Sequence, residues 1–77
     1  MLINVEIYPN PASNFININS NSNETSELII KDMSGRVVSS EKFNSMIKVN
    51  VDNYSKGIYL IDIKNSQGFY SQKITIQ

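Results

Sequence analysis

The chain of 77 residues contains no cysteine, no histidine and no tryptophan. Without cysteine it has no disulfides, no thiolate metal ligands and no thiol nucleophile. Without histidine it lacks the commonest general base and the commonest metal ligand. We therefore expect a protein that is not an enzyme and that has no cofactor and no metal site.

Charge of either sign is also scarce. Seven Lys and Arg residues balance seven Asp and Glu residues, so the formal net charge is zero. Nucleic acids and anionic membranes are bound by clustered Lys and Arg residues, so we expect no nucleic-acid partner. No apolar run approaches the roughly 20 residues of a membrane-spanning helix, which argues against direct membrane insertion. A neutral surface with unpaired strand edges does allow weak self-association.

The sequence is rich in alternating apolar and polar residues. Ile and Val, which favour strands, recur at every second position, and Asn and Ser, which favour turns, stand between these runs. The alternating segments are residues 3–8, 15–19, 27–31, 36–42, 46–51, 57–63 and 69–76. Seven short strands separated by turns are typical of an antiparallel β-sandwich or a small barrel, so the predicted fold class is all-β.

The same alternation predicts which side chains face the core. The inward residues are Ile3, Val5, Ile7, Ile16, Ile18, Leu28, Ile30, Ile47, Val49, Val51, Tyr59, Ile61, Ile63, Tyr70, Ile74 and Ile76. The strand that begins at Gly57 is apolar on both faces, so we expect it in the middle of a sheet. Tyr54 lies in the connection before this strand and is expected to close one end of the core.

Two turns are marked by their residue types. Pro9 cannot donate a hydrogen bond to a strand ladder, so Tyr8-Pro9-Asn10-Pro11 ends the first strand in a stiff turn. In Asp32-Met33-Ser34-Gly35, the Asp side chain can bond backbone two residues later, and Gly tolerates a positive φ. This second combination predicts a type I turn followed by a left-handed residue, which closes a hairpin.

Four segments follow one another in a recognisable order. They are Tyr8-Pro9-Asn10-Pro11, Asp32-x-x-Gly35-Arg36, Gly57-x-Tyr59 and the terminal Lys73-Ile74-x-Ile76. In this order and spacing, over essentially the full chain, the sequence resembles the type A C-terminal sorting domain of the type IX (Por) secretion system. The resemblance implies a seven-stranded, immunoglobulin-like β-sandwich without catalytic residues.

The resemblance also implies a function. Such domains are C-terminal signals of secreted proteins of Bacteroidota, recognised by the type IX machinery for outer-membrane translocation and cell-surface anchoring of the cargo. The implied partners are the outer-membrane translocon and a sortase-like protease. Residues 1–77 would then be one sorting domain of a larger secreted protein, which reaches the cell surface through the periplasm. The segment 1–6 lacks the basic and apolar regions of a signal peptide, so we expect the export signal elsewhere in that protein.

By this resemblance, recognition involves the residues of the four segments: Tyr8, Pro9, Asn10, Pro11, Asp32, Gly35, Arg36, Gly57, Tyr59, Lys73, Ile74 and Ile76. Each segment also has a purely structural interpretation. The turn is a rigid corner, Gly57 permits a close backbone approach, Tyr59 fills the core, and the last strand completes the sandwich. We expect the terminal segment from Lys73 to matter most, because an exposed terminal strand can extend a partner's sheet.

Other functions remain open from the residues alone. The chain could be a carbohydrate-binding or structural β-sandwich module appended to a secreted enzyme, with an aromatic platform built from Tyr8, Phe15, Tyr54, Phe69 and Tyr70. It could also be a folding or oligomerisation module. A calcium site at Asp32, Asp52 and Asp62 is not expected, because these residues lack the dense spacing that hard cations require.

Overall fold

The computed structural model describes residues 4–77 and forms seven β-strands. Their bounds are β1 (Val5–Tyr8), β2 (Phe15–Ser20), β3 (Thr25–Asp32), β4 (Val37–Asn44), β5 (Met46–Asn50), β6 (Gly57–Asn65) and β7 (Gly68–Ile76). No helix occurs among these residues, and so none that is long and apolar enough to cross a membrane. The predicted all-β fold is confirmed, while the predicted inward position of Ile3 lies outside the described residues.

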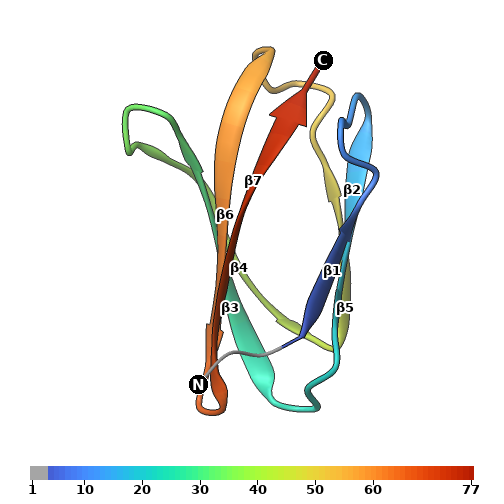
Figure 1. Ribbon diagram of the computed structural model, residues 1–77, viewed down its shortest axis with the longest axis vertical. Helices are drawn as coiled ribbons and strands as arrows, with labels where there is room; N and C mark the ends of the chain where they lie inside the picture. The colour runs from blue at the N-terminus through green and yellow to red at the C-terminus, as the bar shows by residue number, and fades with distance from the viewer. Residues whose placement is uncertain (1–3) are drawn as a thin grey trace.

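The strands form two layers that face each other (Figure 1). Hydrogen-bonded neighbours follow the order β1-β2-β5-β4-β3-β6-β7, and every pair of strands is antiparallel. β4 meets β5 only at Asn44 and Met46, where the chain turns at Ser45 with a φ of 67°. This corner separates the layer β1-β2-β5 from the layer β4-β3-β6-β7, as expected for an immunoglobulin-like sandwich.

The core lies between the two layers and is built mainly from Ile. Its buried residues are Ile7, Ala12, Ile16, Ile18, Leu28, Ile30, Phe43, Val49, Val51, Tyr59, Ile61, Ile63, Ile74 and Ile76. β6 pairs with β3 on one side and with β7 on the other, which confirms its predicted central position. Val5, Ile47, Tyr54 and Tyr70 are only partly buried and pack against this core.

β4 differs from the strand predicted there. The sequence interpretation ended this strand at Lys42 and assigned Val37 and Val38 to it, but both valines are exposed and the buried residue is Phe43. The physical reason is a register shift: Ile30 pairs with Ser39 whereas Lys31 pairs with Val37, so Val38 is an extra residue that interrupts the alternation.

Buried serines stabilise the end of the sandwich where the β2–β3 loop and the β6–β7 hairpin lie. Polar residues 20–24 connect two strands, and Ser20 and Ser22 of this segment and Ser26 of β3 are buried. The Ser22 hydroxyl donates to Gln67 Oε1 over 2.7 Å, and Asn65 Nδ2 donates to Ser26 Oγ over 3.0 Å. The first bond ties the β2–β3 loop to the β6–β7 hairpin and the second ties β3 to β6, so the hydroxyls of Ser22 and Ser26 are satisfied.

Candidate functional site

The four segments singled out in the sequence lie at one end of the sandwich. Across the strand ladders, Asp32 pairs with Tyr59, Tyr59 pairs with Ile74, and Ile76 pairs with Gly57. Ile76 also forms a parallel bridge with Ala12, directly after the proline turn. Figure 1 shows the C-terminus, the β1–β2 turn, the β3–β4 hairpin and the β5–β6 connection at this same end. We call this end, formed by residues 8–12, 32–36, 57–59 and 73–77, the C-terminal pole.

The proline turn is bonded to the terminal strand. The Ala12 N–H donates to the Thr75 carbonyl over 2.8 Å, and the Gln77 N–H donates to the Ala12 carbonyl over 2.8 Å. Asn10 Oδ1 accepts from the Thr75 N–H over 3.1 Å. The Tyr8-Pro9 and Asn10-Pro11 peptide bonds are both cis. The turn therefore covers the outer edge of β7 where that strand ends.

The terminal strand is part of the core rather than a free tail. Its inward residues Ile74 and Ile76 are buried, Ile76 to 3% exposure. Lys73 and Thr75 alternate with them and are exposed on the outer face. Because β6 pairs with one edge and Ala12 covers the end of the other, the groups that this segment offers to a partner are its exposed side chains.

The β3–β4 hairpin is held by one carboxylate. Asp32 Oδ1 accepts from the Ser34 N–H, the Ser34 hydroxyl and the Arg36 N–H at 3.0, 2.6 and 3.0 Å, while Arg36 Nε lies 3.1 Å from Oδ2. The hydrogen bond from the Ser34 hydroxyl is the main reason that the pKa of Asp32 is lowered. Gly35 has a φ of 90°, so the predicted turn with a left-handed glycine is confirmed. Arg36 remains 79% exposed at the tip.

Gly57 and Tyr59 begin β6. A Cβ atom at Gly57 would meet nothing within 4 Å, so the expected close backbone approach is wrong. The glycine is required instead by its φ of 149°, which side chains rarely allow. Tyr59 fills the core as predicted, and its hydroxyl donates to the Ser55 carbonyl over 2.6 Å. The Tyr54 ring packs 5.4 Å from the Tyr59 ring and covers this end of the core, also as predicted.

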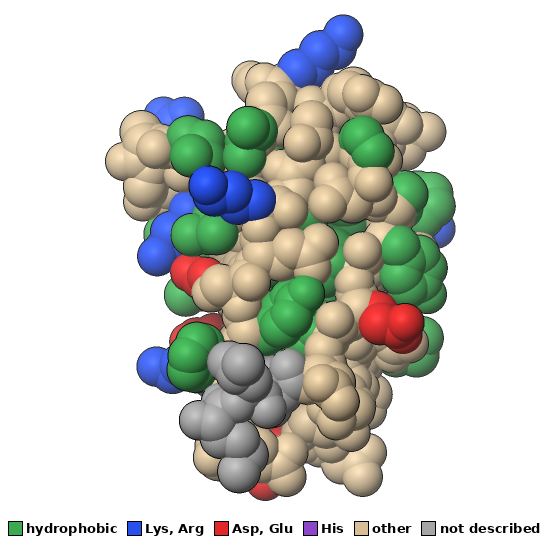
Figure 2. All heavy atoms as spheres, viewed as in Figure 1, with side chains coloured by type: hydrophobic (Ala, Val, Ile, Leu, Met, Phe, Trp, Pro, Cys, Tyr) green, Lys and Arg blue, Asp and Glu red, His purple; other side chains and the backbone are tan. Residues whose placement is uncertain are grey.

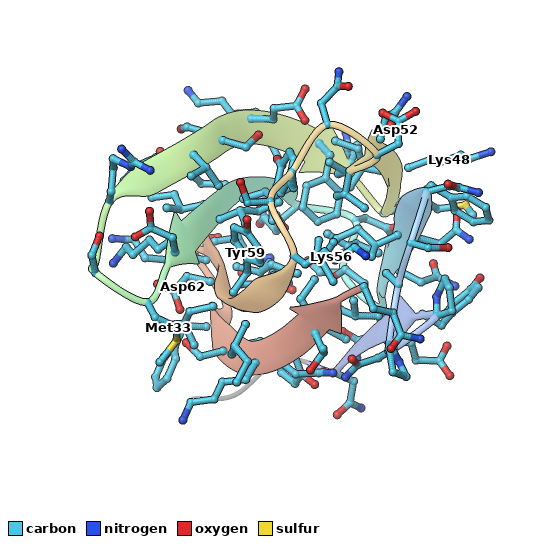
Figure 3. The ribbon with its side chains drawn as sticks, turned by 90° about the horizontal axis from the view of Figure 1, so that it is seen from above. Met33, Lys48, Asp52, Lys56, Tyr59 and Asp62 are labelled. Carbon is cyan, nitrogen blue, oxygen red and sulfur yellow. The ribbon has the colours of Figure 1, made fainter. Side chains whose placement is uncertain are left out.

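A shallow hollow of about 650 Å³ opens between the hairpin and the β5–β6 connection. Its lining includes Arg36, Val38, Lys56, Ile58 and Tyr54. Figure 3 looks down on this end and shows Tyr59 directed into the interior beneath the connection. The hollow is therefore an open surface feature whose walls are partly apolar and also carry the charged side chains of Asp32, Arg36 and Lys56.

Comparison with known protein families matches residues 6–77 to the secretion system C-terminal sorting domain. The chain belongs to this family. The match runs from β1 to the last residue and includes every segment of the C-terminal pole. The sorting domain is the C-terminal signal of secreted or cell-surface cargo, is recognised by the type IX secretion machinery and belongs to a family that is not catalytic. Comparison with curated proteins found no match.

The aromatic residues of the sorting domain do not share one surface. Tyr54 and Tyr59 pack together at the core, while Tyr8 and Phe69 are about half exposed on the outer faces of opposite layers. Phe15 is covered by Lys48, whose Nζ lies 4.4 Å from the ring centroid, and Figure 3 shows Lys48 on the layer away from the hairpin. The aromatic platform considered from the sequence is therefore not formed.

Acidic residues are equally dispersed in the sorting domain. Within residues 4–77, no three His, Cys, Asp or Glu side chains form a group that could hold a metal ion. Asp32 is engaged in its own hairpin, and Asp62 accepts from the Ser71 hydroxyl over 2.6 Å and lies 3.4 Å from Lys31 Nζ. The structure does not bring Asp32, Asp52 and Asp62 together.

The predicted site residues did not include Ala12 of the C-terminal pole or Val38 of the adjoining hollow. Ala12 is almost completely buried and is the backbone partner of the terminal strand, but a lone small residue after Pro11 carries no periodic signal. Val38 lines the hollow because of the extra residue in β4, which only the observed register reveals. The order of the four segments was visible in the sequence, while the contacts between them were not.

Proposed function

We propose that this sorting domain is one part of a larger exported protein and that the outer-membrane translocon of the type IX system recognises its C-terminal pole. In this proposal the cargo first crosses the inner membrane and enters the periplasm, and a sortase-like protease separates the cargo from the domain after translocation. The observation that carries the proposal is the convergence of four distant segments on one end of a folded domain. A rigid surface of this kind loses little conformational entropy when it binds.

We also propose that the domain has no catalytic activity of its own. Polar groups at the pole already have structural partners: the Asp32 carboxylate accepts four hydrogen bonds within its hairpin, and the Tyr59 hydroxyl donates to a backbone carbonyl. Groups held in this way support a surface rather than transfer protons. The exposed residues Arg36, Lys73 and Thr75 remain for recognition, each as a binding group.

A transport assay tests the proposal. Residues 1–77 are fused to the C-terminus of a reporter with an inner-membrane export signal, in a host that carries the type IX machinery. The fusion is expected at the cell surface, and a scrambled sequence of the same composition is expected to leave the reporter in the periplasm. If both fusions remain in the periplasm, the proposal is wrong.

The role of the terminal segment needs a test that preserves the core. Deleting residues 73–77 is expected to abolish delivery, but this deletion also removes Ile74 and Ile76 from the core. Lys73→Ala combined with Thr75→Ala removes only exposed side chains and is expected to reduce delivery several-fold. Lys64→Ala, an exposed lysine outside the pole, is the matched control and should leave delivery unchanged. If the double variant is delivered as well as Lys64→Ala and the unsubstituted fusion while the deletion is not delivered, the terminal segment acts only through folding.

A further inference from the structure

The strand edges of the sandwich are protected to different degrees. β1 has only four residues and ends at Pro9, and the end of β7 is covered by Ala12. β4 has eight residues and pairs along its length with β3, but it meets β5 only at Asn44. Among residues 4–77, no other backbone pairs with its second edge between Val37 and Phe43, and the outer edge of β7 is likewise unpaired from Gly68 to Lys73. Proteins usually shorten, cover or interrupt such edges, because unpaired strands attract other strands.

The direction of the free groups on β4 follows from its one contact with β5. Asn44 faces β5, and backbone groups alternate in direction along an antiparallel strand. The N–H and C=O groups of Lys42 and Ser40 therefore point to the same side, away from β3. Of the β4 side chains only that of Phe43 is buried, at 7% exposure, so the edge is sterically open.

The hollow of the C-terminal pole adjoins the beginning of this edge. Val38 belongs to β4 and also lines the hollow, as do Asp32, Arg36 and Lys56. The Asp32 carboxylate is satisfied within its hairpin, so the positive charge of Lys56 has no acidic partner among the described residues. Figure 2 shows that most Lys and Arg side chains visible in that view lie over the layer that contains β4. Arg36 is paired with Asp32, so Lys56 is the cation of the hollow that an acidic group of a partner can neutralise.

We propose that the sorting domain binds its partner by β-augmentation at β4: an extended segment of the secretion machinery adds a strand to the free edge and places an acidic side chain beside Lys56. The inference rests on the proposed function, since it identifies how the pole is recognised. Main-chain hydrogen bonds to Ser40 and Lys42 supply affinity, and the hollow beside Val38 supplies specificity. β7 supports the fold and is not the strand that pairs with the partner.

Proline substitutions test this assignment. Ser40→Pro removes an outward N–H from β4, and Ser71→Pro is the control on the β7 edge, because the Ser71 N–H faces away from β6. Ser71→Ala accounts for the hydroxyl bond to Asp62 that Ser71→Pro also removes. Proline is tolerated at such edge positions, so both variants should keep the β-sheet circular-dichroism spectrum. In the reporter assay, Ser40→Pro is expected to reduce surface delivery at least tenfold, whereas Ser71→Pro should retain most of it.

A charge variant tests the acidic partner without altering any strand. Lys56 lies in the β5–β6 connection, outside the strand ladders, so Lys56→Glu leaves the backbone pairing of the sheet intact. It is expected to reduce delivery several-fold, and Lys64→Glu, the control on the far part of β6, should have little effect. This variant keeps the test valid even if Ser40→Pro fails to fold.

The outcomes separate this inference from the proposed function. If the unsubstituted fusion is delivered and both Ser40→Pro and Lys56→Glu are delivered equally well, the β4 assignment is overturned while the sorting function stands. If the unsubstituted fusion is not delivered, the proposed function itself fails. A concentration-dependent dimer in sedimentation that Ser40→Pro abolishes, with delivery unaffected, overturns the inference in favour of pairing between two copies of the domain.

Discussion

Replacing Ile76 by alanine examines the packing of the terminal strand. Ile76 is 3% exposed, pairs with Gly57 and bridges to Ala12, so it connects β6, β7 and the proline turn. Truncating a buried isoleucine to alanine costs about 2–5 kcal/mol. Ile76 is the last residue of β7, and Gly57 opposite it has no side chain, so the site can partly collapse. We therefore expect a loss at the lower end, about 2–3 kcal/mol.

This loss is large for a domain of 77 residues. At about 0.05–0.15 kcal/mol per residue, the free energy of unfolding is about 4–12 kcal/mol. A change of 1 kcal/mol shifts the melting temperature of a domain of this size by about 4–8 °C, so Ile76→Ala should lower it by about 10–20 °C. Ile76→Val keeps most of the side chain and should cost only about 0.5–1.5 kcal/mol.

Urea unfolding followed by far-ultraviolet circular dichroism measures both variants against the unsubstituted domain. The order of stability should be unsubstituted, Ile76→Val, Ile76→Ala, with similar denaturant slopes. If Ile76→Ala unfolds within about 0.5 kcal/mol of the unsubstituted domain, a value typical of surface substitutions, then the terminal strand is not packed in solution. In that case the description of the C-terminal pole as a rigid surface fails.

Three further substitutions test local features. Because the pKa of Asp32 is lowered from its ordinary value of 3.8, the charged carboxylate stabilises the fold above that pH, and this stabilisation is lost as the pH falls through the folded-state pKa. In acid titrations of stability, Asp32→Asn should remove this part of the pH dependence and leave the part that comes from the other carboxyl groups. Ser45 has a φ of 67°, so Ser45→Gly should raise the free energy of unfolding by about 0.5–1 kcal/mol in urea titrations, and a decrease would contradict the strain. Tyr59→Phe leaves the Ser55 carbonyl without its donor and should cost about 0.5–1.5 kcal/mol by thermal unfolding, whereas an unchanged melting temperature would exclude that bond.

The strands could be predicted from the sequence because one face of each is buried. In β6, Tyr59, Ile61 and Ile63 alternate with residues of the outer face, and the structure buries all three. Ser26 lies two residues before Leu28 on β3 and continues the same alternation, but the predicted strand began only at residue 27. Burial of a serine depends on Asn65, which is 39 residues away, so local pattern could not reveal it.

The arrangement of the candidate site could be predicted only in part. The hairpin at Asp32 and Gly35 is a local structure, and its residue types determined it. The convergence of the four segments is not local, because it depends on the pairing of β3 with β6 and on the bridge between Ala12 and Ile76. The free edge of β4 likewise depends on the corner at Ser45, a serine in a left-handed conformation that its residue type does not predict.

Exposure of a fused reporter on intact cells tests the central claim most directly. Externally added protease should degrade a reporter that carries residues 1–77 in cells with the type IX machinery, and the same reporter should be protected in cells that lack the outer-membrane translocon. Protection in both strains, with the fusion present and folded in the periplasm, would contradict the conclusion that this all-β domain is a sorting signal.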